Sequence, residues 1–185
     1  HGGLFILGDK NSFDKGSNPW EYDKAKYFTD LGYVYVSVNY RLAENANLLD
    51  WLQGNAELDF TSTDWTERLG VDDQATDIAT ALKWVIDNAE DWGIDASNIV
   101  MFGHSAGCHL IAQLGARSFL GDRFAEIRPS IKGVVLTDSE SYDIRAALKA
   151  VDPSTTDNND WGYMNVYGVN PSIDTVDFDD EAAAE

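Results

Sequence analysis

Short apolar runs, separated by more polar segments, are the main pattern along this chain. Residues 33–39, 99–102 and 131–137 are rich in aliphatic, β-branched and aromatic side chains and show no regular polar alternation. Such runs are typical of strands that are buried on both faces of a parallel sheet. A shorter apolar run at residues 3–7 indicates a strand end or a loop.

Between these runs lie segments of helical composition, at residues 21–31, 74–92 and about 106–117. The second is the clearest, because its apolar side chains recur every three or four positions and form one stripe. The stripe consists of Ile78, Leu82, Val85, Ile86 and Ala89. Glycines at positions 32 and 93 follow the first two segments and supply helix stop signals. Strands that alternate with helices predict an α/β fold with a parallel sheet, in a single domain over residues 1–185.

Residues 43–68 form the least regular stretch, and they have two interpretations. The stretch contains Trp51 and Trp65 around a polar break. It is either a cap or lid over the strand ends, with the tryptophans lining a pocket for the substrate, or an ordinary surface loop with a short helix. In the second case the tryptophans only anchor the loop by hydrophobic packing.

The charge balance excludes two classes of partner. With 32 acidic and 13 basic residues the chain has a net charge of -19, and such a surface repels nucleic acid and anionic membranes. No apolar run approaches the roughly 20 residues that are needed to span a bilayer. The acidic surface favours solubility and motivates the hypothesis of a saline habitat. The compartment, cytoplasmic or secreted, and the oligomeric state do not follow from the sequence.

The single cysteine of the chain indicates neither a disulfide nor a metal site. Cys108 is the only cysteine, so the chain has no intrachain disulfide and no CxxC-type metal site. We expect Cys108 to be a small buried residue, because no basic partner is evident that would activate its thiol. The sequence predicts neither a metal nor an organic cofactor.

One stretch does carry chemistry, the run Ile99-Val-Met-Phe-Gly-His-Ser-Ala-Gly-Cys-His-Leu110. Here an apolar strand passes through Gly103-x-Ser105-x-Gly107 into a helical segment, which is the order of a nucleophile elbow. A serine at the tip of a strained turn leaves no room for side chains two residues before and after it. The alternative is a glycine-rich turn with a solvated serine.

Together with other motifs, this elbow resembles the α/β-hydrolase superfamily. The closest branch is that of the hormone-sensitive-lipase-like and arylformamidase-like carboxylesterases. The matching segments are His1-Gly-Gly-Leu-Phe5, Val38-Asn-Tyr-Arg-Leu42, Asp77-Ile-Ala-x-Ala-Leu-x-Trp84, Gly103-His-Ser-Ala-Gly107 and Gly133-Val-Val-Leu136. Their order and spacing match the family, so the resemblance implies a doubly wound, mostly parallel sheet with helices on both faces.

The resemblance also implies roles for individual residues. Ser105 corresponds to the nucleophile, and the backbone N–H of Ala106 corresponds to one donor of the oxyanion hole. The N–H groups of Gly3 and Leu4 correspond to the other donors, with Leu4 in place of a usual glycine. His1 is expected to brace this loop through its side chain.

The general base is where the chain departs from the family order of Ser, then Asp or Glu, then His. The histidines are His1, His104 and His109, and we expect neither of the two near Ser105 to act as the base. Asp143 is the best candidate acid after a strand, although a structural role in its loop is the favoured interpretation. We therefore expect this sequence to be part of a longer protein, cut within the first motif and again before the last two strands.

Three functions remain open on these grounds. The first is a serine esterase that cleaves short-chain or aryl esters of small molecules through an acyl-enzyme, with no activity in residues 1–185 alone. The second is a peptidase or amidase on the same fold, and the third is a non-catalytic binding module. An intact elbow around Ser105 favours the enzymes, because a binding module does not need a strained turn.

Overall fold

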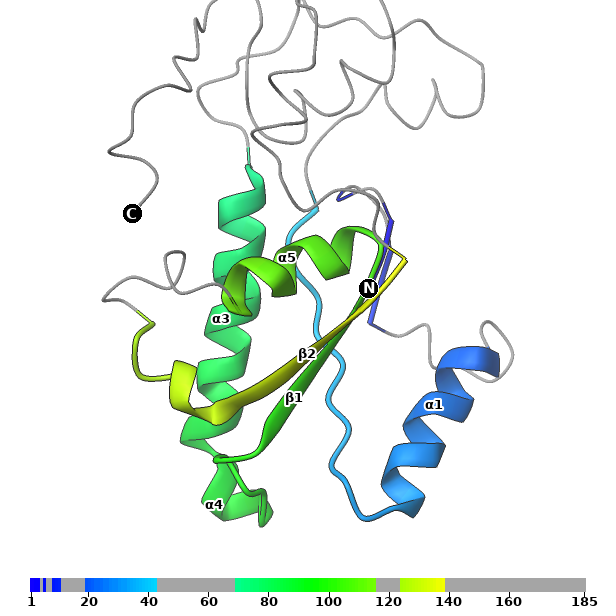
Figure 1. Ribbon diagram of the computed structural model, residues 1–185, viewed down its shortest axis with the longest axis vertical. Coiled ribbons are helices and arrows are strands. Elements are labelled where there is room, and N and C mark those ends of the chain that lie inside the picture. Colours follow the sequence, from blue (N-terminus) through cyan, green and yellow to red (C-terminus); the bar gives the residue numbers. More distant parts are fainter. Residues whose placement is uncertain (4, 6–7, 11–18, 43–68, 116–123, 139–185) are drawn as a thin grey trace, which may run out of the picture.

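The fold was analysed in a computed structural model, which describes residues 1–3, 5, 8–10, 19–42, 69–115 and 124–138. The described elements, in chain order, are α1 (Pro19–Asp30), α3 (Val71–Asp87), α4 (Ala89–Trp92), β1 (Ile99–His104), α5 (Ala106–Gly115), the 3-10 turn η2 (Arg128–Ser130) and β2 (Ile131–Thr137) (Figure 1). The stretch at residues 43–68 with its two tryptophans lies outside the described residues, as does Asp143.

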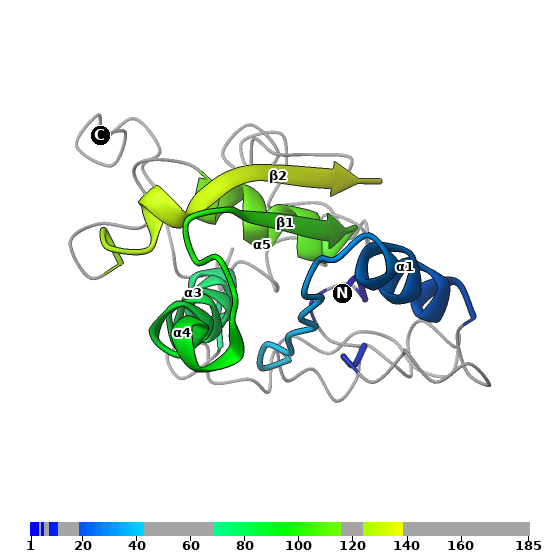
Figure 2. The ribbon, with the colours of Figure 1, turned by 90° about the horizontal axis from the view of Figure 1, so that it is seen from below.

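β1 and β2 are parallel neighbours, as the two apolar runs predicted. The register aligns Ile99 with Ile131 and His104 with Thr137, with one irregularity between Ile99 and Val100. α5 follows β1 directly and packs on both strands, and α3 packs on α5 (Figures 1 and 2). This strand, helix and parallel strand confirm the α/β class.

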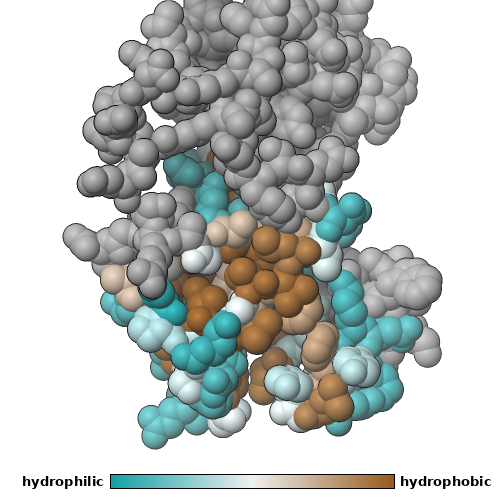
Figure 3. All heavy atoms as spheres, viewed as in Figure 1, coloured by the Kyte–Doolittle hydropathy of each residue, from teal (hydrophilic) through white to brown (hydrophobic). Residues whose placement is uncertain are grey.

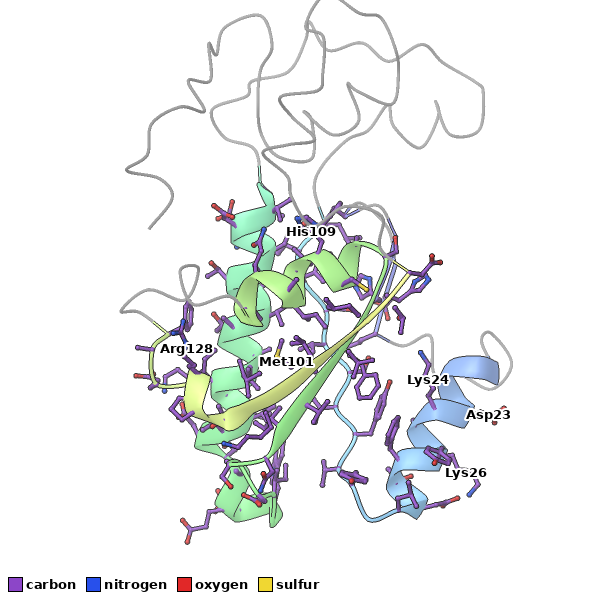
Figure 4. The ribbon with its side chains drawn as sticks, viewed as in Figure 1. Asp23, Lys24, Lys26, Met101, His109 and Arg128 are labelled. Carbon is purple, nitrogen blue, oxygen red and sulfur yellow. The ribbon has the colours of Figure 1, made fainter. Side chains whose placement is uncertain are left out.

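The core lies between the strands and these two helices. Met101 of β1 is buried there with side chains of α3 and α5 (Figure 4). The most completely buried apolar residues are Ala75, Ala79, Cys108, Leu110, Leu114 and Ile127. Cys108 is thus the buried residue that the sequence predicted. Five of these six residues come from α3 and α5, because the apolar faces of the two helices pack against each other.

Apolar side chains also cover part of the opposite side of the strands. Val100 and Phe102 of β1 are about half exposed, and Val135 of β2, which aligns with Phe102, is about one-third exposed. Figure 3 shows hydrophobic residues gathered over the middle of the molecule, where the strands lie in Figure 1. The Phe28 ring of α1 lies 5.3 Å from the Phe102 ring, so α1 contacts this side of β1.

The predicted strand at residues 33–39 is wrong. This segment is an extended coil that leaves α1 and passes β1 without strand pairing (Figure 1). Its polar side chains bond residues 9–10 instead: the Ser37 hydroxyl donates to the Lys10 carbonyl, and the Lys10 N–H donates to Asn39. Tyr33 and Val34 are more than half exposed. Apolar composition predicted burial, but a strand also needs a hydrogen-bonded neighbour, which composition does not specify.

The helix predicted at residues 74–92 exists but differs in two respects. It begins earlier, at Val71, where an Asp73 carboxylate oxygen accepts a hydrogen bond of 2.9 Å from the Gly70 N–H. It also divides into α3 and α4 at Asn88, whose φ of -104° and ψ of 8° leave the helical region. Gly93 ends α4 in a left-handed conformation, as predicted.

Helix α1 confirms the first predicted helix and its stop signal. Gly32 has φ 88°, its N–H bonds the Thr29 carbonyl, and the Tyr33 N–H bonds the Phe28 carbonyl. This pattern is the Schellman motif, which needs a residue with positive φ. None of the helices in the described part of the chain is both long enough and apolar enough to cross a membrane.

Candidate active site

Ser105 lies at the junction between β1 and α5, in a left-handed backbone conformation with φ 50°. Non-glycine residues rarely adopt this conformation, and it occurs where surrounding contacts enforce it. Two such contacts are present: the Ser105 N–H donates to the Thr137 carbonyl at 3.1 Å, and its carbonyl accepts from the Cys108 N–H at 2.9 Å. The side chain is half-buried. This is the geometry that the elbow motif predicted.

The two glycines of the motif are required by close backbone approach. A Cβ on Gly103 would lie 2.6 Å from the Gly107 carbonyl oxygen and 2.7 Å from the Cys108 nitrogen. A Cβ on Gly107 would lie 2.8 Å from the carbonyl oxygen of His1. The predicted reason for these glycines is therefore confirmed, and the second contact shows that the start of the chain touches the elbow.

This contact involves the N-terminal loop, defined here as residues 1–5, of which all but Leu4 are described. A Cβ on Gly2 would lie 3.1 Å from the Ser105 Cβ and 2.7 Å from the His104 Nδ1. Gly3 follows with φ 125°, a conformation open to glycine. The loop therefore brings Gly2, the neighbour of Gly3, next to Ser105 from a position more than 100 residues away in the sequence.

Ala106, the second described candidate for the oxyanion hole, is the first residue of α5 and is buried. The first N–H groups of a helix have no acceptor within the helix, and they lie at its positive end. The N–H of Ala106 is therefore of the kind that can bind an oxyanion next to Ser105. Leu4, the remaining candidate, lies outside the described residues.

His1 is engaged in the loop through its ring, as expected for a brace. Its imidazole stacks on Tyr40 with ring centroids 4.3 Å apart, and its Nδ1 lies 2.9 Å from the Gly2 carbonyl oxygen. The Tyr40 hydroxyl donates to the His1 carbonyl at 2.9 Å. Tyr40 is buried, and this burial raises the pKa of its phenol above the ordinary value.

The other two histidines make contacts with different partners. The Nε2 of His104 lies 3.7 Å from a carboxylate oxygen of Asp138, and both side chains are exposed. His109 is buried in α5, with its ring edge-on to Phe5 at 5.9 Å (Figure 4). That neither ring acts as the general base stays a prediction.

The end of β2 supports the elbow from the side opposite the N-terminal loop. The Thr137 hydroxyl donates to the Gly103 carbonyl at 2.6 Å, and the Cys108 sulfur lies 3.0 Å from both the nitrogen and the carbonyl oxygen of Thr137. Thr137 thus bonds three residues around the turn. Sequence reasoning did not identify it, because its role arises only when β2 pairs with β1.

Sequence reasoning also missed Gln74, a fully buried residue of α3. Its amide donates to the Phe5 carbonyl and to the Arg41 carbonyl, each at 2.8 Å. The available signal was its position four residues before Ile78, which places a polar side chain on the apolar stripe of the helix. Next to it, Arg41 and Asp77 form a bidentate ion pair with a shortest distance of 2.8 Å, which raises the pKa of the guanidinium.

The described residues contain no group of three or more His, Cys, Asp or Glu side chains that could hold a metal ion. What the geometry does bring together is a serine in a strained turn, a helix N-terminus and a glycine loop. These are the parts that acyl transfer needs besides a base and its orienting acid.

Comparison with known proteins supports a specific family. The family model BD-FAE matches residues 59–151, about half of the chain, and the match includes the elbow and both strands. A para-nitrobenzyl esterase of Bacillus subtilis (strain 168) is 36% identical over 114 residues, which cover 62% of this chain and 19% of that enzyme. A probable N-octanoylanthranilate hydrolase, AqdA2, of Rhodococcus erythropolis is 34% identical over 140 residues, covering 70% of this chain and 24% of that protein.

The chain thus spans about a fifth to a quarter of the length of these curated relatives. No solved structure matches it significantly.

Proposed function

This chain belongs to the BD-FAE family and has the α/β-hydrolase fold, and from this premise we propose that its protein is a serine carboxylic ester hydrolase for short-chain or aryl esters. The observation that carries the proposal is the position of Ser105, in a left-handed turn between a strand and a helix. A backbone held in that conformation is costly, and it exposes the serine hydroxyl where a nucleophile is needed.

In the proposed reaction the Ser105 oxygen attacks the ester carbonyl and loses its proton to a general base. The negative charge that develops on the carbonyl oxygen is stabilised by the N–H groups of Ala106, Gly3 and Leu4. Collapse of the tetrahedral intermediate releases the alcohol, which takes up the proton, and leaves an acyl-enzyme on Ser105. Water then attacks the acyl-enzyme and releases the carboxylic acid.

The general base in this proposal comes from outside residues 1–185. Residues 110–185 contain no histidine, while His104 faces Asp138 and His109 packs on Phe5. The acid that orients the base also remains unassigned in this proposal. No metal or organic cofactor takes part in the proposed steps.

The test uses the full-length protein, meaning residues 1–185 with any flanking residues of the natural reading frame. We expect a fluorophosphonate probe to label Ser105, and we expect turnover of p-nitrophenyl acetate that falls at least about a thousandfold in Ser105→Ala. Ser37→Ala, a change at a half-buried serine outside the elbow, is the control and keeps both signals. Absence of labelling and of turnover would overturn the proposal and favour a binding module. Residues 1–185 alone are expected to hydrolyse this ester no faster than their Ser105→Ala variant.

One observation supports a second candidate, an amidase. The Rhodococcus relative is named for an N-octanoyl substrate, in which the acyl group is attached to nitrogen. An amide needs the same nucleophile and oxyanion donors, with protonation of a nitrogen leaving group. Faster turnover of N-acyl anilides than of the matching aryl esters, lost in Ser105→Ala, would replace the esterase proposal with this one.

A further inference from the structure

The N-terminal loop is held at its two ends by buried polar side chains. At one end, the Tyr40 hydroxyl donates to the His1 carbonyl at 2.9 Å while its ring stacks on the imidazole. At the other, the Gln74 amide donates to the Phe5 carbonyl at 2.8 Å. The segment that carries Gly3 therefore lies between two fixed carbonyl groups.

Both side chains are in turn fixed to the body of the fold. Gln74 belongs to α3, and its second N–H bonds the carbonyl of Arg41, the residue after Tyr40. The Arg41 guanidinium forms the bidentate pair with Asp77 one turn along the same helix. Helix α3 thus holds the N-terminal loop directly, through the bond from Gln74 to Phe5. It also holds the loop indirectly, because Gln74 and Asp77 bind Arg41, the residue next to Tyr40.

Packing alone does not account for a glutamine at this position. Gln74 is fully buried, and its Oε1 atom has no hydrogen-bond partner among the described residues. Burying a polar atom without a partner costs free energy, which an apolar side chain of similar size would avoid. What an apolar residue would not supply is the pair of N–H donors that link Phe5 to the segment after Tyr40. Phe5 itself has φ 67°, a conformation that needs enforcement from outside.

We propose that Gln74 and Tyr40 are positioning residues for the oxyanion hole. By holding the Phe5 and His1 carbonyls, they keep the N–H groups of the loop at the distance from Ser105 that the developing oxyanion requires. Neither side chain touches the substrate. This inference rests on the proposed serine hydrolase function, because it assigns the loop its role in that reaction.

The test compares three variants of the full-length protein. Gln74→Met removes both donors at nearly constant volume, and Tyr40→Phe removes one hydroxyl while keeping the ring. The control is Gln113→Met, the same change at an α5 glutamine. Within the described part of the chain, its Oε1 is also buried without a partner, and it has no hydrogen bond to the loop. Active sites are counted by fluorophosphonate titration, so kcat refers only to correctly folded molecules.

We expect Gln74→Met to lower kcat per active site by about 10- to 100-fold, since small misplacements of catalytic groups have effects of that size. Tyr40→Phe lowers it by several-fold, and KM stays within about threefold in both, because the donors act on the transition state. The inhibition constant of a trifluoromethyl ketone, whose adduct with Ser105 carries an oxyanion, rises by the factor by which kcat/KM falls. Gln113→Met leaves all three values unchanged.

A folded Gln74→Met protein with wild-type kcat and inhibition constant would overturn the inference, as would an equal loss in Gln113→Met. If Gln74→Met does not fold, Tyr40→Phe decides by the same measurements. Failure of the proposed function has a different signature: the wild-type protein itself shows no Ser105-dependent turnover, and the inference then falls with it.

Discussion

The backbone of Ser105 is held by three separate parts of the chain. Its N–H bonds Thr137 at the end of β2, and its carbonyl bonds Cys108 in the first turn of α5. Gly2 of the N-terminal loop approaches from the other side, so closely that a side chain there would meet the Ser105 Cβ. A left-handed serine is stable only if such contacts outweigh its cost, which is of the order of 1–3 kcal/mol. The strain at the proposed nucleophile is therefore a property of the assembled fold and not of the local sequence.

At the scale of single residues, the contact between Gly107 and His1 leads to a prediction about stability. In Gly107→Ala the new Cβ would lie 2.8 Å from the His1 carbonyl oxygen and 3.2 Å from its carbonyl carbon. Both atoms belong to the backbone, so no side-chain rotation relieves the clash. We expect a loss of about 1–3 kcal/mol in the free energy of unfolding, measured by chemical denaturation, because overpacking costs that much.

Gly133→Ala in β2 is the matched control for this change. Nothing lies within 4 Å of a Cβ at Gly133, and alanine is favoured over glycine within a strand by roughly 0.5–1 kcal/mol. The control should therefore be as stable as the wild type or more so. Equal stability of Gly107→Ala and wild type would show that the N-terminal loop does not pack on the elbow in solution.

At the scale of elements, the sequence predicted those whose signals are local. β1, β2 and α5 follow from apolar runs and from the elbow motif, and α1 follows from its composition and from Gly32. The break between α3 and α4 had no signal of this kind, because Asn88 is a residue that helices tolerate. The segment at residues 33–39 has the composition of a buried strand, but strand pairing depends on a neighbour that composition does not name.

The turn between α4 and β1 contains a carboxylate whose hydrogen bonds make its contribution pH-dependent. Asp95 accepts from the N–H and hydroxyl of Ser97 at 2.9 Å and 2.6 Å, and from the Asn98 side chain at 2.6 Å. The hydrogen bonds from Ser97, then those from Asn98, lower the pKa of Asp95 below its ordinary value. A carboxyl whose pKa is lower in the folded state stabilises the fold above its unfolded pKa, and that stabilisation disappears as the pH falls through the folded pKa.

We therefore expect Asp95→Ala to lower the Tm at neutral pH, and we expect the difference from wild type to shrink as the pH falls below about 4, the ordinary range of an aspartate. Thermal unfolding followed by circular dichroism across this pH range measures the difference. Asp91→Asn, a change at an exposed carboxylate of α4, provides the control and should show no such trend. A Tm difference for Asp95→Ala that does not depend on pH would contradict the hydrogen-bond explanation.

At the scale of the whole molecule, the candidate site combines segments that are distant in the sequence. Motif reasoning proposed Ser105, Gly3, Leu4 and Ala106 as candidates, because an elbow and a glycine loop have recognisable patterns. It assigned no role to Gln74 or Thr137, whose importance comes from tertiary contacts with those motifs. Candidate residues for the chemistry can therefore be proposed from spacing, while the residues that hold them in place are found only in the folded structure.

The net charge of -19 gives the prediction that concerns the molecule as a whole. Within the described residues, ion pairs offset some of it, such as Lys26 with Asp30 and Lys83 with Asp87 and Glu126. The remaining acids repel one another and destabilise the compact state. Raising NaCl from about 0.01 M to about 1 M shortens the screening length from roughly 30 Å to roughly 3 Å. We expect the Tm to rise with salt, and equally in KCl, because screening does not depend on which monovalent cation is used. A sharp loss of folding at low salt would support the saline-habitat hypothesis, and a Tm indifferent to salt would refute it.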